Sequence, residues 1–171
     1  MKNEASERLL KNYYNSRKSW EAWCYLNNID LKNSKPEIRK YVDENELLYY
    51  LRYLALKDVH IELYKILKNS KNTVDNIFML LNQNPQTKAK EHLLKLNEFE
   101  TEIKSLTNAR DKFYAHLDSD YKDFLSNFEI ESYYTIFELI EEAIFILGKE
   151  NELLELLKEI PSRDEFYINK N

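Results

Sequence analysis

The sequence predicts an all-α protein, and two features of its composition carry that prediction. The 171 residues include one glycine and three prolines, whereas sheets with tight hairpins need these residues at their turns. Long segments are rich in Leu, Lys and Glu, which favour helices. A chain of this length is expected to fold as one domain around a hydrophobic core. We expect a bundle of about five to six helices over residues 1–160 and a C-terminal tail over residues 161–171.

Apolar spacing and end signals place the first two helices. The first covers about residues 5–27 and has an apolar side of leucine, tyrosine and tryptophan. Pro36 suits a first helical turn, and a long helix is expected to continue from it to about residue 69. That helix has two apolar sides, which predicts a central position in the bundle. Asp58 falls within its second apolar side.

The later helices are bounded by clearer signals. Thr73 is a candidate cap for a short helix that Asn84-Pro85 ends. A long helix after it is expected to kink near residues 105–108, and Gly148 is expected to end or bend the apolar helix that follows. The expected helices cover about residues 73–84, 87–117, 131–147 and 150–160.

Composition excludes several kinds of protein. The single cysteine, Cys24, rules out an intrachain disulfide and a thiolate metal site. The N-terminus lacks the apolar segment of a signal peptide. Glutamates interrupt the most apolar stretch, residues 136–147, which predicts a buried helix and no membrane span. We therefore expect a cytoplasmic protein with no membrane partner.

The charge distribution limits how this chain could bind nucleic acid. The net charge is −5, and the lysines are interspersed with Asp and Glu, without a basic block. Proteins that bind DNA or RNA tightly and generally carry a basic face, because phosphate contacts dominate affinity. The sequence therefore disfavours general nucleic-acid binding. A small site that contacts one or two phosphates remains compatible with it.

The most informative segment reads NARDKFYAHLD, over residues 108–118. Arg110 lies on the apolar stripe of its helix, between Leu106 and Phe113, on a face that is predicted to be buried. A buried arginine is costly unless an anion meets it. The apolar positions of the stripe follow at steps of three, four or seven residues: Leu96, Phe99, Ile103, Leu106, Phe113 and Leu117.

Arg110 and His116 together could cleave RNA. Histidine titrates near neutrality, so it can take a proton from a hydroxyl and return one to a leaving oxygen. Arginine can hold two phosphate oxygens at once and stabilise charge that develops on them. RNA brings its own nucleophile, the ribose 2′-hydroxyl. No cluster of carboxylates with metal-ligand spacing lies near the segment, so we expect neither a metal nor another cofactor.

The spacing of this pair suggests a dimer. Six residues along a regular helix place the two side chains roughly 120° apart around the axis and about 9 Å apart along it. One copy of the helix would make a poor active site. Two antiparallel copies could bring both pairs into a shared cleft, which predicts a symmetric homodimer through this helix with a composite site.

The segment from Arg110 to Asp118 resembles the signature of HEPN domains, which is an arginine, four to six residues, and a histidine. The string RDKFYAHLD is similar to the abortive-infection-associated branch of that family in particular. The resemblance implies a small helical bundle that dimerises and acts as a metal-independent ribonuclease in toxin–antitoxin or phage-defence systems. Arg110 and His116 would then be the catalytic pair, with Asp111 orienting, and the products would carry 2′,3′-cyclic phosphate ends. The partners implied are RNA and an antitoxin or other regulatory protein.

Three further residues are candidate supporting groups. Lys112 lies one turn before His116 and could steer a phosphate or lower the pKa of the histidine. Tyr114 lies one turn after Arg110 and could contact a base. Asp58 is the candidate for a buried carboxylate that pairs with Arg110, either structurally or as a resting partner in the site. His60 lies close to Asp58 in sequence, and His92 is expected to be solvated.

Three functions are compatible with this pattern. The first is a HEPN endoribonuclease that needs both Arg110 and His116 and cleaves a narrow class of RNA. The second is a non-catalytic HEPN-like module that dimerises or binds a nucleotide or a partner, in which His116 is dispensable or donates to a backbone carbonyl. The third is a plain helical dimerisation domain in which Arg110 fixes the register.

Overall fold

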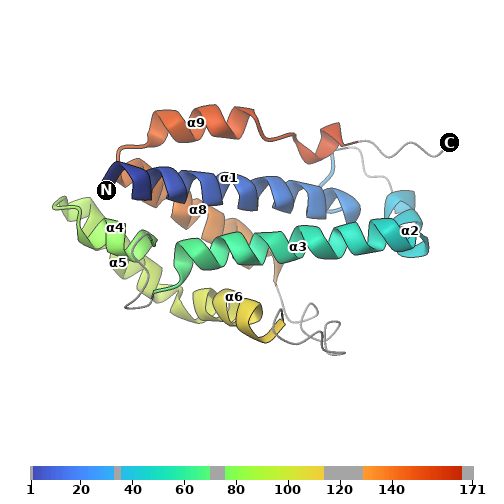
Figure 1. The fold of residues 1–171 in the computed structure, drawn as a ribbon, viewed down its shortest axis with the longest axis horizontal. Helices are drawn as coiled ribbons and strands as arrows, with labels where there is room; N and C mark the ends of the chain where they lie inside the picture. Colours follow the sequence, from blue (N-terminus) through green and yellow to red (C-terminus); the bar gives the residue numbers. More distant parts are fainter. Residues whose placement is uncertain (1, 33–35, 70–75, 114–128, 167–171) are drawn as a thin grey trace.

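The computed structural model describes residues 2–32, 36–69, 76–113 and 129–166. Over these residues the chain forms eight α-helices and one short 3-10 helix, with no β-strand (Figure 1). The predicted all-α class is confirmed. The helices are α1 (Lys2–Leu26), α2 (Pro36–Glu44), α3 (Glu46–Leu67), α4 (Ile77–Asn82), α5 (Thr87–Glu98), α6 (Glu100–Phe113), α8 (Ile130–Ile146), α9 (Glu150–Lys158) and the 3-10 helix η1 (Arg163–Glu165).

Two of the predicted long helices are each divided in two, which accounts for the larger number of elements. Asn45 separates α2 from α3, and its side chain accepts a hydrogen bond from the Leu48 amide at 3.1 Å. An asparagine in this position caps a new helix instead of continuing the old one. Phe99 separates α5 from α6 with φ −98° and ψ 20°. The kink expected near residues 105–108 is therefore wrong, since the break lies at Phe99, which packs against the core.

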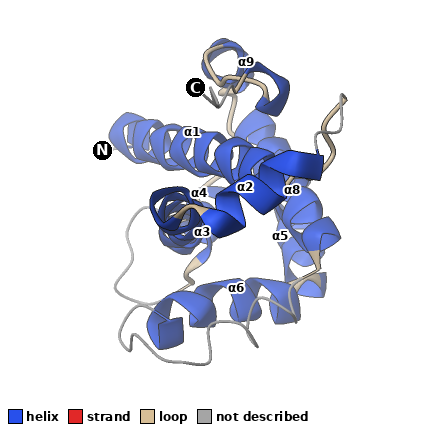
Figure 2. Ribbon diagram, turned by 90° about the vertical axis from the view of Figure 1, so that its right-hand side faces the viewer, coloured by secondary structure: helices blue, strands red, loops and turns tan. Residues whose placement is uncertain are grey.

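α3 occupies the centre of the bundle, as its two apolar sides predicted. α1 runs beside it along the long axis, with α9 on the outer side of α1 (Figure 1). Seen from the end of the molecule, α3 lies between α1 and α6 (Figure 2). α6, the helix that carries Arg110, is thus held against α3 at the edge of the bundle.

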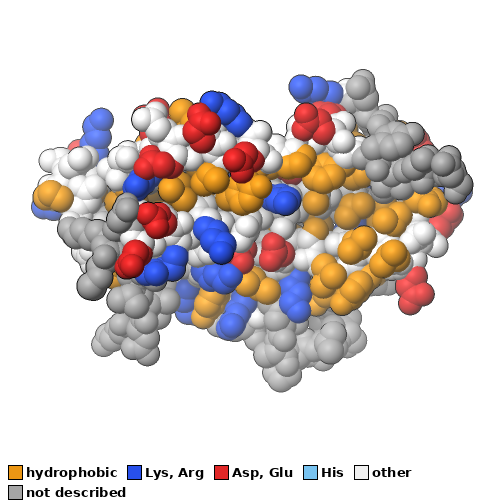
Figure 3. All heavy atoms as spheres, turned by 45° about the horizontal axis from the view of Figure 1, so that its top comes forward, with side chains coloured by type: hydrophobic (Ala, Val, Ile, Leu, Met, Phe, Trp, Pro, Cys, Tyr) orange, Lys and Arg blue, Asp and Glu red, His pale blue; other side chains and the backbone are white. Residues whose placement is uncertain are grey.

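Only part of the second apolar side of α3 is covered. Leu54 and Ile61 are half-buried, whereas Leu47 is 64% exposed and Leu51 is 43% exposed. Figure 3 shows hydrophobic side chains gathered at the surface over the end of the molecule that carries α2 and the start of α3. The periodicity of α3 predicted this apolar side, but the packing of a single chain covers only its C-terminal half.

An aromatic cluster between α1 and α8 forms the centre of the core. Trp20 is fully buried and stacks on Tyr133 with 4.5 Å between ring centroids and on Trp23 with 5.0 Å. Tyr13 and Phe137 meet edge to face at 6.0 Å. Aromatic side chains bury large apolar areas and add specific ring contacts. No helix among the described residues is long and apolar enough to cross a membrane.

One helix end follows a predicted signal, and another helix has a cap that the sequence analysis did not predict. Gly148 ends α8 with φ +75°, a conformation that only glycine adopts without strain, as its position in the sequence predicted. α4 is capped by Asn76, whose side chain accepts from the Met79 amide at 2.8 Å. Thr73, the predicted cap, lies outside the described residues.

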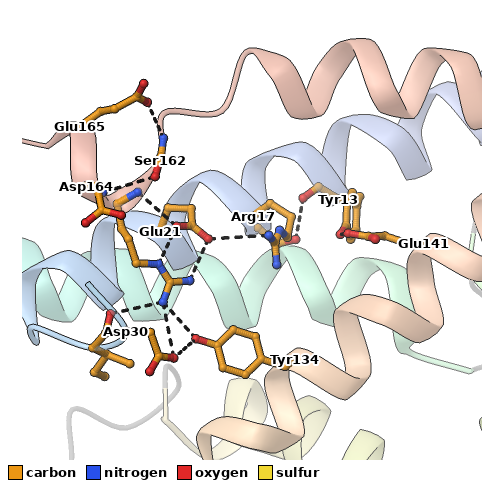
Figure 4. Close-up of polar contacts among 12 residues, drawn as sticks. Tyr13, Arg17, Glu21, Asp30, Tyr134, Glu141, Ser162, Asp164 and Glu165 are labelled. Carbon is orange, nitrogen blue, oxygen red and sulfur yellow. Dashed lines mark hydrogen bonds and ion pairs between the residues drawn. The ribbon is translucent and has the colours of Figure 1, made fainter. Parts of the chain in front are cut away.

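The segment after α9 is docked on the domain, although the sequence suggested a tail from residue 161. Arg163 is buried and places its guanidinium on Glu21 of α1, with Nε–Oε2 at 2.8 Å and Nη2–Oε1 at 3.0 Å. It also donates to the Tyr134 hydroxyl at 3.0 Å (Figure 4). Burial alone would lower the pKa of Arg163, but the hydrogen bonds that it donates to Glu21 and Tyr134 raise it, so the guanidinium stays charged. Residues 161–166 are therefore part of the fold.

Candidate functional site

The apolar stripe of α5 and α6 is buried up to the turn that carries Arg110. Leu96, Ile103 and Leu106 are 1%, 5% and 1% exposed. Arg110 itself is exposed, so the expectation that a single chain buries it is wrong. The buried face of α6 ends with Leu106 and Thr107, which are 1% and 4% exposed. The arginine at the next stripe position consequently faces the surface.

Arg110 is held by an aromatic ring of α3. Its guanidinium carbon lies 4.7 Å from the centroid of the Tyr64 ring, and the Lys68 ammonium lies 5.3 Å from the same centroid. A cation above an aromatic face is attracted by the ring quadrupole. A cation–π contact does not itself use the N–H groups of a guanidinium as hydrogen-bond donors. Tyr64 therefore orients Arg110 in a way that is compatible with binding a phosphate.

Asp58, the carboxylate expected beside Arg110, has a different partner. Its Oδ2 accepts a hydrogen bond of 2.6 Å from the Ser19 hydroxyl of α1. Asp58 therefore lies on the α1 side of α3, whereas Tyr64 lies on the side that faces α6. The helix positions explain this difference, because six residues separate Asp58 from Tyr64 and place them roughly 120° apart. The structure does not bring Asp58 and Arg110 together.

The other predicted site residues cannot be placed in the same detail. Asp111 and Lys112 lie in the last turn of α6, but their side chains are outside the described part of the structure. Tyr114 and His116 also lie outside the described residues. The geometry of the predicted pair therefore rests on Arg110 alone.

The two histidines that the structure describes belong to the core. His60 is 1% exposed, and its Nε2 shares a hydrogen bond of 2.7 Å with the Tyr133 hydroxyl. His92 was expected to be solvated, but it is 4% exposed, with Nε2 2.9 Å from the Leu139 carbonyl oxygen. Burial lowers the pKa of both histidines. Each therefore fills a structural position on its helix.

Acidification is expected to destabilise the fold through His60. Burial lowers the pKa of His60 from 6.5 to about 4. The unfolded chain consequently takes up a proton first, so the free energy of unfolding falls as the pH drops from 6.5 towards 4 and then levels off. The loss amounts to about 3 kcal/mol. Urea denaturation at pH 7 and pH 4.5 measures it.

His60→Gln is the matched comparison for that measurement. Glutamine keeps a hydrogen-bonding group for Tyr133 but does not titrate, and His92 is present in both proteins. The variant should lose less stability on acidification than the wild type does. Equal losses in both proteins would contradict a contribution from His60.

Sequence reasoning missed a cavity whose lining includes Thr107 and Asn108, in the turn of α6 before Arg110, and does not include Arg110 itself. It has a volume of about 350 Å³ and is enclosed by α3, α4, α5 and α6. Asparagines contribute much of its polar lining. Because asparagine is frequent throughout this sequence, no single asparagine stood out as a candidate site residue. Only the packing of α6 against α3 and α5 brings them together. The lining residues are Leu67, Lys68, Asn69, Phe78, Leu96, Asn97, Glu100, Ile103, Lys104, Thr107 and Asn108.

Neither Cys24 nor the acidic residues of the described chain form an evident reactive centre. Cys24 is fully buried, and burial raises the pKa of its thiol to about 12. A thiol in this state is a poor nucleophile near neutral pH. Within the described ranges, no three His, Cys, Asp or Glu side chains are grouped so that they could hold a metal ion.

Comparison of the chain with protein-family models, curated proteins and solved structures gave no match. Its assignment to a function therefore depends on the motif and on the geometry around Arg110.

Proposed function

We propose that this protein is a metal-independent endoribonuclease of the HEPN type, with a toxin or phage-defence role in the cytoplasm. The observation that carries the proposal is the position of Arg110. It is exposed on a helix whose apolar stripe is buried in the preceding turns, and the Tyr64 ring lies against its guanidinium. His116 follows in the same motif, and the two histidines outside the motif serve the core.

The proposed reaction uses the 2′-hydroxyl of the substrate as the nucleophile. His116 takes the proton of that hydroxyl, and the 2′-oxygen forms a bond to the adjacent phosphorus. The bond from phosphorus to the 5′-oxygen breaks, and this oxygen leaves with a proton. The products are a 2′,3′-cyclic phosphate end and a 5′-hydroxyl end. Arg110 stabilises the negative charge that develops on the phosphoryl oxygens in the transition state.

The supporting residues have proposed roles around this step. Asp111 orients the catalytic pair, Lys112 draws the phosphate towards His116, and Tyr114 contacts a neighbouring base. Asp58 faces α1 and accepts from Ser19, so we assign it no role at the phosphate.

The active unit is proposed to be a homodimer. On a regular helix a spacing of six residues corresponds to roughly 120°, so two antiparallel copies of the motif would complete a site better than one copy. The exposure of Arg110 at the edge of the bundle supports this arrangement, because a second chain can reach it. An antitoxin that binds the same surface would block the site.

The substrate is expected to be a narrow class of RNA. The chain carries a net charge of −5, so long-range attraction to phosphate is weak and recognition must come from local contacts. A structured loop presents its bases for such contacts. Indiscriminate digestion of unstructured RNA at physiological salt would contradict this expectation.

Cleavage in the presence of a chelator tests the proposed chemistry. Wild-type protein incubated with cellular RNA should cleave it at an unchanged rate when EDTA is added, and the products should carry 2′,3′-cyclic phosphate ends. The assay is gel analysis followed by ligation that selects such ends. Cleavage that stops in EDTA and returns with Mg²⁺, or products with 5′-phosphate ends, would contradict the proposal.

A non-catalytic nucleotide-binding module is the second candidate, and the cavity beside Arg110 favours it. Such a module would bind nucleotides through Arg110 without cleaving RNA. The two candidates differ at His116, which only the ribonuclease requires.

A further inference from the structure

We infer that the cavity beside Arg110 binds one base of the RNA substrate next to the scissile phosphate and thereby selects the cleavage site. The inference rests on the proposed ribonuclease function, which it makes more specific. A volume of about 350 Å³ lies within the range of cavities that hold small ligands of nucleotide size.

The floor of the cavity suits the flat face of a base. Leu67 and Leu96 are each 1% exposed, and Ile103 is 5% exposed. Phe78 of α4 is the aromatic member of this floor. An apolar wall of this kind treats all four bases alike, so any selection among bases must come from polar groups.

The polar groups that could distinguish one base from another lie at the rim of the cavity. Asn69, Asn97 and Asn108 lie at its exposed edge, and each amide offers two N–H donors and a carbonyl acceptor. An amide can form two hydrogen bonds with the edge of one base, and this pairing distinguishes bases. Three amides around one cavity therefore form a potential reading site for a base edge.

The cavity lies one helical turn before Arg110. Ile103, Lys104, Thr107 and Asn108 line it from α6, and the next turn carries Arg110, three residues after Thr107, and Asp111, three residues after Asn108. Thr107 and Arg110 are about 4.5 Å apart along the helix axis. A base in the cavity would place its own phosphate within reach of the guanidinium.

The local charge is also suited to a nucleotide. Lys68 and Lys104 line the cavity together with a single acid, Glu100, which pairs with Lys104 at 2.8 Å. Lys68 shares the Tyr64 ring with Arg110. The cavity and Arg110 thus form one cationic region on a chain whose net charge is negative. A local cationic region on an acidic chain favours a phosphate-bearing ligand at the cavity.

Binding of the four ribonucleoside 3′-monophosphates tests the inference directly. Wild-type protein titrated by calorimetry should prefer one of the four by about tenfold or more. The variant Asn97→Ala/Asn108→Ala should bind that nucleotide about tenfold more weakly and lose the preference. Lys104→Ala should weaken all four nucleotides to a similar extent, since it removes a positive charge from the cavity lining but none of the three amides.

The chain offers matched controls on α9. Asn151 is an exposed helical asparagine, and Lys158 pairs with Glu155 as Lys104 pairs with Glu100. Asn151→Ala and Lys158→Ala should leave all four affinities unchanged. Asn97 and Asn108 are exposed, so their variants should keep the wild-type circular dichroism spectrum. Equal binding of the four nucleotides, or a preference that survives Asn97→Ala/Asn108→Ala, would overturn the inference.

Mapping of cleavage sites separates this inference from the ribonuclease proposal. Asn97→Ala/Asn108→Ala should still cleave RNA, but at a wider set of sequences. If cleavage depends on Arg110 and His116 and the variant keeps the wild-type sites, the inference fails and the ribonuclease proposal stands. If wild type selects one nucleotide but cleaves no RNA, the ribonuclease proposal fails and the base-binding cavity stands as part of a binding module.

Discussion

Replacement of His116 by alanine is expected to slow RNA cleavage by about 10²–10⁴-fold, which is the usual contribution of a general base. The variant loses the group that takes the proton of the 2′-hydroxyl but keeps Arg110 and the cavity. The measurement is single-turnover cleavage of a defined RNA in EDTA. The variant should sediment as the wild type does, because a histidine used only for catalysis contributes little to the fold.

Arg110→Ala is expected to lower the same rate by about 10²–10³-fold, as the loss of a transition-state donor does. The cleavage rate of Arg110→Lys should lie between those of the wild type and Arg110→Ala. Lysine keeps the positive charge but cannot hold two phosphate oxygens in a planar fork. Tyr64→Phe keeps the ring beneath Arg110 and should retain most activity. Lys158→Ala is the control for loss of an exposed cation. Full activity of both His116→Ala and Arg110→Ala would contradict the catalytic assignment.

Arg163→Met is expected to lower the free energy of unfolding by about 3–5 kcal/mol, because it leaves the Glu21 carboxylate buried without its main partner. The side chains of Glu21 and Arg163 are each 10% exposed and share two hydrogen bonds. The residual contact of Glu21 with Arg17 at 3.7 Å offsets only part of the loss (Figure 4). Urea denaturation at pH 7 measures the change.

The double variant Glu21→Leu/Arg163→Met distinguishes an ion pair from simple packing. A buried pair replaced by apolar groups can be nearly neutral, so this protein should be more stable than either single variant. Glu155→Ala removes an exposed pair with Lys158 and should change stability by less than about 1 kcal/mol. If the single variants lose no more stability than Glu155→Ala does, the Glu21–Arg163 pair does not hold the segment after α9.

Sequence reasoning predicted the helical class because composition alone decides it. One glycine and three prolines cannot supply the turns of a sheet. The positions of Pro36 and Gly148 also marked a helix start and a helix end correctly. These signals are local, so they can be read without knowledge of the tertiary packing.

The breaks inside the long helices could not be predicted in the same way. Asn45 and Phe99 lie within stretches whose apolar periodicity continues across them. What breaks the helix at Asn45 is a side chain that caps the following turn, and what redirects it at Phe99 is packing against the core. The first is a choice between competing local conformations, and the second coincides with a tertiary contact.

Placement of the charged and polar groups depended most on contacts between distant segments. Arg163 contacts a glutamate that lies 142 residues earlier in the chain, so no local pattern predicted that it would be buried. His92 is hydrogen-bonded to a carbonyl oxygen of α8. Asp58 accepts a hydrogen bond from a serine of α1 and does not pair with Arg110. For the candidate site, the motif predicted Arg110 as the central residue, whereas the cavity beside it emerged only from the assembly of four helices.

Mapping of RNA ends is the most direct test of Arg110 and His116 as a ribonuclease pair. Total cellular RNA is incubated in EDTA with the wild type, Arg110→Ala or His116→Ala, and the ends that carry 2′,3′-cyclic phosphate are sequenced. We expect a small set of new ends with the wild type and none with either variant, all three proteins having the same oligomeric state. The same set of ends with all three proteins would contradict the catalytic role of the pair.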